Sequence, residues 1–387
     1  MGSTLVVNPG STSRKYAWYQ GTTQVLVVAV ETTPAGLAVF VTDQAGQTTQ
    51  VDDAPVSLLQ AFSHAHNIAV AEGVSTPAVT PRVALRVVAP GEVFARHQLW
   101  SPDLESALAD AAPLVPLHIP IVQAELHAVR EVLPEAEIVG ASDSAFHAEP
   151  DRRVRATGLA SEAEQNHSWR RFGYHGLSVA STARQLRERE GVLPERTIVC
   201  HLGGGVSVTA LKDGQSIATS MGLTPASGVA MGSRGGDMAA DELAALLTVG
   251  DITPDTMWNY LYTETGWYGK TGQADLRAVL DAASDSTSSA AAAVNAFVYQ
   301  VQAYIAQYVV LLGGIDRIVL TGTAAVRNSY IRARVLQDLH VLGVELDDDT
   351  NESLRGNGVL TTAASAVTAE VMANDEFGEM VRIAESL

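Results

Sequence analysis

The first 140 residues alternate between short apolar runs and segments with apolar residues at helical spacing. Apolar runs and runs of alternating polarity predict strands, and several of them in succession predict an antiparallel meander. The predicted strands are 4–7, the return from Tyr16, 23–30, 37–41, 84–88 and 137–140. The predicted helices are 56–72, 102–111 after a Ser101 cap, and 122–132.

A second series of similar order begins near Arg196. Its predicted strands are 198–200, 206–211, 216–219 and 317–321, and Asp213-Gly214 predicts a hairpin. Its predicted helices are 241–248, 253–264, 284–312 and 361–374, and residues 150–168 form a connector with some helix. Two copies of one order of elements predict a duplicated α/β fold with a ligand cleft between the copies.

Glycine clusters interrupt the second series at two places. Gly203-Gly204-Gly205 follows a predicted strand, and Arg234 is set in Gly232-Ser233-Arg234-Gly235-Gly236-Asp237. Glycine lets a backbone approach a ligand closely, and N–H groups exposed in such turns bind phosphate oxygens. The residues alone leave two interpretations open, a phosphate site and a tight turn that joins core strands.

Composition narrows the class of protein. The chain has 387 residues, 47% of them hydrophobic, and a formal net charge of −18. This length suits two or three domains, and the charge argues against nucleic acid and anionic membranes as partners. The single cysteine, Cys200, lies in an apolar run, so we expect no intrachain disulfide and no cysteine metal site. Without a signal-peptide pattern or a membrane-length apolar run, the protein is expected to be cytoplasmic.

Polar side chains gather where the predicted strands end, which is where open α/β folds bind ligands. They are Asn8, Ser11, Ser13, Lys15, Asp143, His175, His201 and Arg234, with Arg86 inside a strand. One carboxylate with arginines, histidines and hydroxyls suits phosphoryl transfer better than a stable metal site. Structural roles are the alternatives: Asp143 would also suit a helix cap, and His175 would also suit a turn. His201 would suit a core histidine, and Arg86 a structural ion pair.

Segments over nearly the whole chain resemble, in order, the motifs of the acetate kinase family, whose superfamily includes sugar kinases, actin and heat-shock chaperone ATPases. They are Asn8-Pro9-Gly10-Ser11-Thr12-Ser13-Arg14-Lys15-Tyr16, Arg86-Val87-Val88, Pro116-Leu117-His118, Asp143-Ser144-Ala145-Phe146-His147, 170–176, 201–207, 221–237 and Asp275-Leu276-Arg277. The resemblance implies an α/β fold of two ribonuclease H-like (actin-like ATPase) domains with an interdomain cleft. The first would be residues 1–148, with a C-terminal helix at about 372–387 packed back on it. The second, residues 149–371, would bind nucleotide and form a homodimer.

The resemblance also implies small-molecule substrates and an activity, the reversible transfer of a phosphoryl group between ATP and acetate with Mg²⁺ or Mn²⁺. It assigns catalysis to Arg86, Asp143, His175 and Arg234. It assigns acetate binding to Arg86, Val88, Leu117, His118, Tyr174 and Pro225. It assigns ATP and its phosphates to Ser11, Ser13, Lys15, His201, Gly203, Gly204, Gly205, Asp275, Leu276, Arg277, Gly322, Thr323 and Ala324, and the metal to Asn8.

Three departures from the family pattern concern nucleotide and metal. Gly204 stands where the family has asparagine, and the usual G-I-G-E-N is replaced at 322–328. The C-terminal T-N-E-E, whose glutamate belongs to the metal site, reads Thr362-Ala363-Ala364-Ser365. The usual glutamate is therefore expected to be replaced at Ala364/Ser365, and Glu370 is the next acidic residue.

Three functions stay open at this point. The first is acetate kinase. The second is an acyl kinase of the same family with another donor or acceptor, such as pyrophosphate, phosphate or propionate. The third is a non-catalytic binder of nucleotide or acyl phosphate. The presence of all four catalytic residues argues against the third function.

Overall fold

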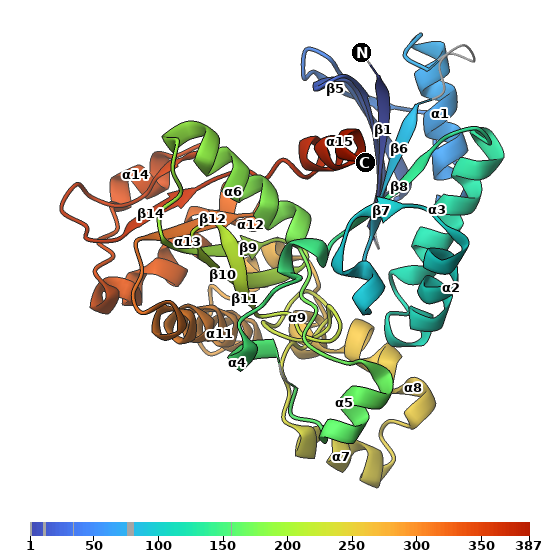
Figure 1. Cartoon of the computed structure of the whole chain (residues 1–387). Coiled ribbons are helices and arrows are strands. Elements are labelled where there is room, and N and C mark those ends of the chain that lie inside the picture. The colour runs from blue at the N-terminus through green and yellow to red at the C-terminus, as the bar shows by residue number, and fades with distance from the viewer. Residues whose placement is uncertain (1, 11–12, 34, 76–80, 156) are drawn as a thin grey trace. The chain divides into compact units, whose positions relative to one another are not determined.

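A computed structural model describes residues 2–10, 13–33, 35–75, 81–155 and 157–387 (Figure 1). The chain divides into two compact units. The first comprises Met1–Ala145 with Glu376–Leu387, and the second comprises Phe146–Asp375. Each unit is built on one mixed sheet, and each is described by itself below.

The first unit contains an eight-stranded sheet. In spatial order its strands are β5 (Thr48–Val51), β4 (Gly36–Asp43), β3 (Thr23–Thr33), β2 (Ser13–Gln20), β1 (Ser3–Pro9), β6 (Arg82–Val87), β8 (Ile138–Ser142) and β7 (Gln98–Leu99). Strands β1 to β5 form an antiparallel meander, and β6 and β8 continue the sheet parallel to β1. The carboxyl ends of β1, β6 and β8 therefore lie at one edge of the sheet.

Helices cover both faces of this sheet (Figure 1). They are α1 (Ala61–Ala71), α2 (Pro102–Ala111), α3 (Ile119–Val132) and α15 (Glu376–Ser386). The α2 helix begins at the predicted cap, where Ser101 Oγ accepts a hydrogen bond from the Leu104 N–H at 3.2 Å. The α15 helix contacts β1, β6 and β8 and buries Met380 and Val381.

The second unit repeats the arrangement with six strands. In spatial order they are β11 (Gln215–Thr219), β10 (Val206–Lys212), β9 (Arg196–Leu202), β12 (Arg317–Thr321), β14 (Thr368–Val371) and β13 (Gly358–Val359). Strands β9 to β11 form an antiparallel meander, and β12 and β14 continue parallel to β9. The same order of strands in both units confirms the predicted duplicated α/β fold. The Asp213-Gly214 hairpin is confirmed too, since both residues have the positive φ (51° and 81°) that such a turn requires.

The helices of the second unit are α4 (Arg152–Arg155), α5 (Ser161–His167), α6 (Gly176–Glu190), α7 (Ala240–Val249), α8 (Pro254–Asn259), α9 (Gly266–Thr271), α10 (Leu276–Ala282), α11 (Ser289–Leu312), α12 (Thr323–Arg327), α13 (Ser329–Leu336) and α14 (Asp348–Ser353). A π-helical turn, Tyr260–Glu264, continues α8. The α11 helix packs along β10 and β9 and buries ten of its residues, Phe297 and Ile305 among them. No helix in the described ranges is long and apolar enough to cross a membrane.

Two sequence predictions fail in the second unit. The predicted helix 361–374 is absent, because residues 368–371 form the buried parallel strand β14. The helix α6 was not predicted, although it has 15 residues. Several of its inward-facing residues are small and polar, with Ser178, Ser181 and Thr182 fully buried, so the sequence carries little apolar periodicity there.

Candidate active site

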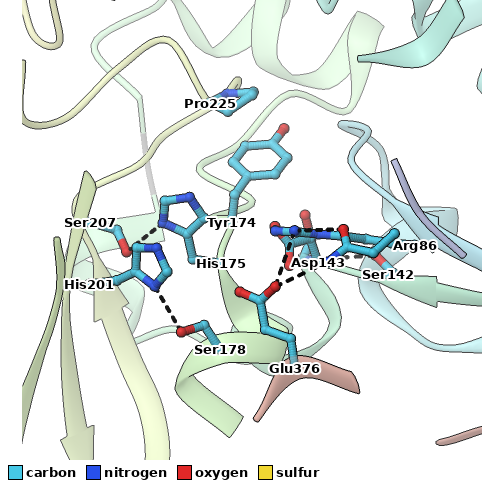
Figure 2. Close-up of polar contacts among 12 residues, drawn as sticks. Arg86, Ser142, Asp143, Tyr174, His175, Ser178, His201, Ser207, Pro225 and Glu376 are labelled. Atoms are coloured by element: carbon cyan, nitrogen blue, oxygen red, sulfur yellow. Dashed lines mark hydrogen bonds and ion pairs between the residues drawn. The ribbon is translucent and has the colours of Figure 1, made fainter. Parts of the chain in front are cut away.

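Arg86 is the centre of a polar cluster in the first unit. It lies on β6, between the ends of β1 and β8 that carry Asn8 and Asp143. Arg86 Nη2 lies 2.9 Å from Asp143 Oδ2 (Figure 2), and Arg86 Nη1 donates a hydrogen bond to Asn8 Oδ1 at 3.1 Å. Burial alone would lower the pKa of Arg86, but the Asp143 and Glu376 carboxylates outweigh burial and raise this pKa. The guanidinium is therefore held as a charged, oriented group.

Glu376 completes the cluster from the first residue of α15. Its Oε2 atom lies 3.4 Å from Arg86 Nη1 and accepts a 3.4 Å contact from Asn8 Nδ2. The carboxylate that contacts Asn8 from the C-terminal part of the chain is therefore that of Glu376, and from the sequence this group had been sought at 362–365 and at Glu370. The sequence feature that could have identified Glu376 is Asp375-Glu376 ahead of an amphipathic stretch, since acidic residues are favoured in the first turn of a helix.

The two alternatives that the sequence suggested lie elsewhere. Thr362 and Ser365 belong to the loop before β14, where their side chains bond to Glu345 and to the Gly343 carbonyl. Glu370 is fully buried in β14, and its carboxylate is bound by Arg189 at 2.6 Å and by Arg317 at 2.8 Å. The Glu370 carboxylate is thus committed to an internal ion-pair network.

The other candidates of the first unit come from four segments of the chain. They are Ser13 and Lys15 in β2, Val88 directly after β6, and Leu117 and His118 ahead of α3. Lys15 is partly buried and pairs with Asn8 in the register of β1 and β2. Val88 is buried, with 7% of its surface exposed. Ser11 lies outside the described residues.

Two histidine rings, those of His175 and His201, lie against each other in the second unit, with centroids 4.2 Å apart and ring planes inclined by 30°. His175 directly precedes α6 and has a φ of 62°, which is uncommon for a residue with a side chain. Its Nδ1 lies 3.1 Å from Ser207 Oγ, and His201 Nδ1 lies 2.8 Å from Ser178 Oγ (Figure 2). The two hydroxyls thereby fix the orientation of both rings. Ser178 and Ser207 had not been assigned roles from the sequence.

Arg234 supplies a cation beside these histidines. Its Nη1 donates a hydrogen bond to the Pro225 carbonyl at 2.8 Å. Within the described ranges no carboxylate lies at salt-bridge distance from Arg234, and burial lowers the pKa of its guanidinium. A cation withdrawn from water without a counter-ion is costly, so this position favours an anionic ligand.

Gly205 is the point where His175 and Arg234 come together. A Cβ atom at Gly205 would lie 2.6 Å from His175 Nε2 and 3.1 Å from Arg234 Nη2, whereas the space around a Cβ at Gly204 is open. We expect Gly205→Ala to displace the imidazole and to lower kcat about 100-fold. Gly204→Ala is the matched control and should leave kcat within about threefold. Equal activities of the two variants, measured as acyl phosphate turnover, would contradict this placement of His175.

The two apolar candidates of the second unit lie on two loops, Tyr174 ahead of α6 and Pro225 after β11, that are joined by a hydrogen bond. Tyr174 is fully buried, and its hydroxyl donates a 2.7 Å hydrogen bond to the Leu223 carbonyl. Pro225 is two residues further along and is bound through its carbonyl by Arg234. These two loops therefore connect the apolar candidates with the catalytic candidate Arg234.

The glycines of the candidate nucleotide motifs lie at the carboxyl ends of β9 and β12. Thr321 at the end of β12 is level with His201 in β9, so Gly322 lies beside Gly203 to Gly205. A Cβ at Gly322 would lie 2.5 Å from the Leu202 carbonyl oxygen, and its φ of 85° also requires glycine. Thr323 and Ala324 then begin α12.

Asp275, Leu276 and Arg277 lie apart from these groups at the start of α10. Asp275 caps that helix, and its Oδ2 atom pairs with Arg277 Nη2 at 2.6 Å. Both charged side chains are largely exposed, 49% and 84% respectively. Within the described ranges their hydrogen bonds connect them to each other and to no other candidate residue.

Comparisons with known proteins show which family this chain is similar to. The sequence model of the acetokinase family matches residues 3–383. The acetate kinase of Clostridioides difficile is 31% identical over 386 residues, which cover 96% of each chain. That of Clavibacter michiganensis is 32% identical over 385 residues, covering 98% of this chain and 97% of the relative. Two crystal structures are also similar at 26% identity. A propionate kinase from Francisella tularensis has a TM-score of 0.89 over 100% of both chains, and Porphyromonas gingivalis acetate kinase has 0.85 over 100% of this chain and 99% of its own.

Proposed function

This chain belongs to the acetokinase family of ATP-dependent phosphotransferases, and we propose that it is an acetate kinase. The reaction is the reversible transfer of the γ-phosphoryl group of ATP to acetate. A carboxylate oxygen of acetate forms the new bond to phosphorus, the bond to the β,γ-bridging oxygen breaks, and the products are acetyl phosphate and ADP.

The environment of the Arg234 guanidinium is the main support for this proposal. A guanidinium with no carboxylate partner among the described residues, held beside an oriented histidine, is suited to a charge that is present only when substrate is bound. In phosphoryl transfer that charge is spread over the equatorial oxygens of the moving group. Arg234 would neutralise it, and His175 Nε2 would donate a hydrogen bond to one of these oxygens.

Arg86 and Asp143 would serve the acceptor. Arg86 would bind the acetate carboxylate, because a guanidinium matches a carboxylate with two parallel N–H groups. Asp143 is 1% exposed and holds Arg86 at 2.9 Å, so it would fix the direction of those N–H groups. Holding the acceptor carboxylate close to the phosphoryl group in the correct orientation accounts for much of the rate enhancement in reactions without a covalent enzyme intermediate.

The same cluster fits Mg²⁺. Asn8, Asp143 and Glu376 supply an amide oxygen and two carboxylates, the hard ligands that Mg²⁺ prefers, and it commonly takes one or two carboxylates together with substrate phosphates. No group of three His, Cys, Asp or Glu side chains suited to a metal occurs in the described ranges. When bound, Mg²⁺ would neutralise phosphate charge. We assign its protein contacts to Asn8, Asp143 and Glu376.

The donor is tested directly by two assays. The first follows hydroxamate formation from acetate with ATP and Mg²⁺, and the second follows acetyl phosphate consumption with ADP or with phosphate. We expect turnover with both nucleotides and none with phosphate. Turnover with phosphate alone would instead establish the pyrophosphate-linked reaction. No turnover in any arm would leave a nucleotide or acyl-phosphate binder.

A second acceptor, propionate, is favoured by one observation. The propionate kinase structure matches this chain over its full length with a TM-score of 0.89. The acyl group would lie against Val88, which is buried beside the Arg86 strand. One methylene in an apolar pocket is worth roughly 1–3 kcal/mol, so the two acids are separated by small differences in packing.

Val88→Ala tests the acyl pocket. Removing two methyl groups leaves room for about one additional methylene, so we expect kcat/KM for propionate relative to acetate to rise about tenfold. Val70→Ala is the matched control, because Val70 is 46% exposed on α1 and should leave the ratio unchanged. An unchanged ratio in Val88→Ala would remove Val88 from the acyl pocket.

A further inference from the structure

A buried ion pair connects the hairpin of β1 and β2 with the helix α3. Arg14 is 7% exposed and lies in β2, and its Nε atom is 3.1 Å from Glu125 Oε1. Arg14 Nη1 donates to the Ser13 carbonyl at 3.2 Å and also to the Gly10 carbonyl. One guanidinium therefore holds both ends of the hairpin turn and is itself held by Glu125.

Tyr16 fixes the other side of the same carboxylate. Its hydroxyl donates to both Glu125 oxygens at 3.0 Å, and its ring packs edge-on against Phe62 with centroids 5.5 Å apart. Tyr16 and Glu125 are 0% and 3% exposed. Both carboxylate oxygens of Glu125 thus accept from a buried hydroxyl, which restrains the group that binds Arg14.

Maintaining a charge at Glu125 costs folding free energy. Burial raises the pKa of Glu125 to about 7, although the Tyr16 hydrogen bond and Arg14 each lower it. Because this pKa is above that of an unfolded chain, the contribution of Glu125 to stability is lost as pH rises through about 7. Above that pH the carboxylate is charged and binds Arg14 as an ion, and below it the ionic contact is lost. A contribution to folding stability therefore does not by itself explain why a buried Glu125–Arg14 ion pair is present at this position.

The neighbouring titratable groups do not replace this contact. In the described ranges the charged or titratable side chains in contact with Glu125 are Arg14 and Tyr16. From α1, which packs on α3, His66 lies one ring further away, stacked on Phe62 at 6.3 Å. Burial lowers the pKa of His66, so this ring is neutral where Glu125 titrates.

We propose that Glu125 is a positioning residue, which acts through Arg14 to hold Gly10 and Ser13, and with them the adjoining ends of β1 and β2, in the arrangement that binds the phosphoryl substrate. These strand ends carry Asn8 in β1 and Ser13 and Lys15 in β2, and Asn8 is level with Lys15 in the β1–β2 register. This inference rests on the proposed function, because that function places phosphate at this hairpin. It adds to that function two residues, Arg14 and Glu125, that touch no substrate and nevertheless set its affinity.

The first test is the pH dependence of KM for acetyl phosphate between about pH 6 and pH 8.5. In the parent, KM should rise as pH falls through about 7, as Glu125 loses its charge. Glu125→Gln should show a KM about tenfold higher that no longer follows this step, with kcat within about threefold. Tyr16→Phe removes a donor that stabilises the ionised form, so the step should move to higher pH. Glu131→Gln, an exposed position on the same helix, is the matched control and should reproduce the parent.

The second test needs no catalysis. The triple variant Arg14→Leu/Tyr16→Phe/Glu125→Leu replaces the buried polar group by apolar side chains, a change that commonly preserves the fold. We expect a melting temperature close to that of the parent, with amide hydrogen exchange at Gly10 faster by about tenfold or more. The Gly10 amide is informative because it donates to the Ser13 carbonyl at 2.8 Å, and Arg14 binds the carbonyls of these same two residues.

The outcomes separate this inference from the proposed function. If Glu125→Gln keeps the parental pH profile of KM, or if Gly10 exchange is unchanged in the folded triple variant, the positioning role is overturned. If the parent itself lacks acyl phosphate turnover, the proposed function fails, and faster Gly10 exchange in the triple variant would still support the hold of Arg14 and Glu125 on the turn.

Discussion

Arg234→Ala is expected to lower kcat by about 10³-fold or more, with a melting temperature equal to or above that of the parent. The loss follows because Arg234 is the cation that no carboxylate of the described ranges neutralises, so its charge is available to the transferring phosphoryl group. The unchanged stability follows because an uncompensated, partly buried charge costs free energy in the folded protein. Acetyl phosphate turnover with ADP and thermal unfolding, measured on the same preparation, check both parts.

A matched control uses a second arginine. Arg152 is exposed on α4, and Arg152→Ala should leave kcat and the melting temperature unchanged. Arg234→Lys should recover only part of the activity, because an ammonium group lacks the planar fork of the guanidinium. A parental kcat in Arg234→Ala would remove Arg234 from the site. A large fall in its melting temperature would show instead that Arg234 serves the fold.

Glu376→Gln is expected to lower activity about 10- to 100-fold and to raise the Mg²⁺ concentration needed for half-maximal rate. The amide is nearly isosteric but carries no charge, so it weakens both the hold on Arg86 and the attraction for a divalent cation. The titration of initial rate against Mg²⁺, at saturating nucleotide, is the measurement. The shift in Mg²⁺ requirement distinguishes a metal contact from a loss of Arg86 orientation, which would lower kcat alone.

Glu385→Gln is the control for this prediction. Glu385 lies on the same helix and is exposed, so its removal changes the net charge equally. An Mg²⁺ titration that is the same for Glu376→Gln and the parent would contradict the assignment of Glu376 to the metal. In that case the metal would be left to Asn8, Asp143 and the substrate phosphates.

The strands and turns of this protein were accessible from its sequence because they depend on neighbours in the chain. Apolar runs identified β1 to β4 and β9 to β11, whereas the exposed edge strand β5 was missed. Asp213-Gly214 identified its hairpin because two consecutive positive φ angles suit few other residues. Arg86 was recognised as a buried cation in need of a partner, and its pairing with Asp143 at 2.9 Å confirms the ion-pair interpretation. The glycines at 203–205 were recognised as a place of close approach, and Gly205 has that property toward His175.

Local patterns gave a wrong answer where burial involves small or polar side chains. The α6 helix was missed because it buries serine and threonine, which carry no apolar periodicity. The stretch 361–374 was taken for a helix although 368–371 is a parallel strand, since a short apolar run is compatible with both. With the last helix placed at 361–374, the acidic residue of the C-terminal motif was sought at 362–365. The structure instead places this carboxylate at Glu376, at the start of α15.

The sequence by itself determined the duplicated α/β architecture and the family, because local periodicity and contiguous motifs encode these, and the same motifs supplied Arg86, Asp143, His175 and Arg234 as the catalytic candidates. Only the tertiary structure decided which distant groups meet. Glu376 is 290 positions from Arg86, and Glu125 lies more than a hundred residues beyond Arg14. Such contacts depend on how the strands are ordered in the sheet and which helix covers them, and no single stretch of chain carries that information.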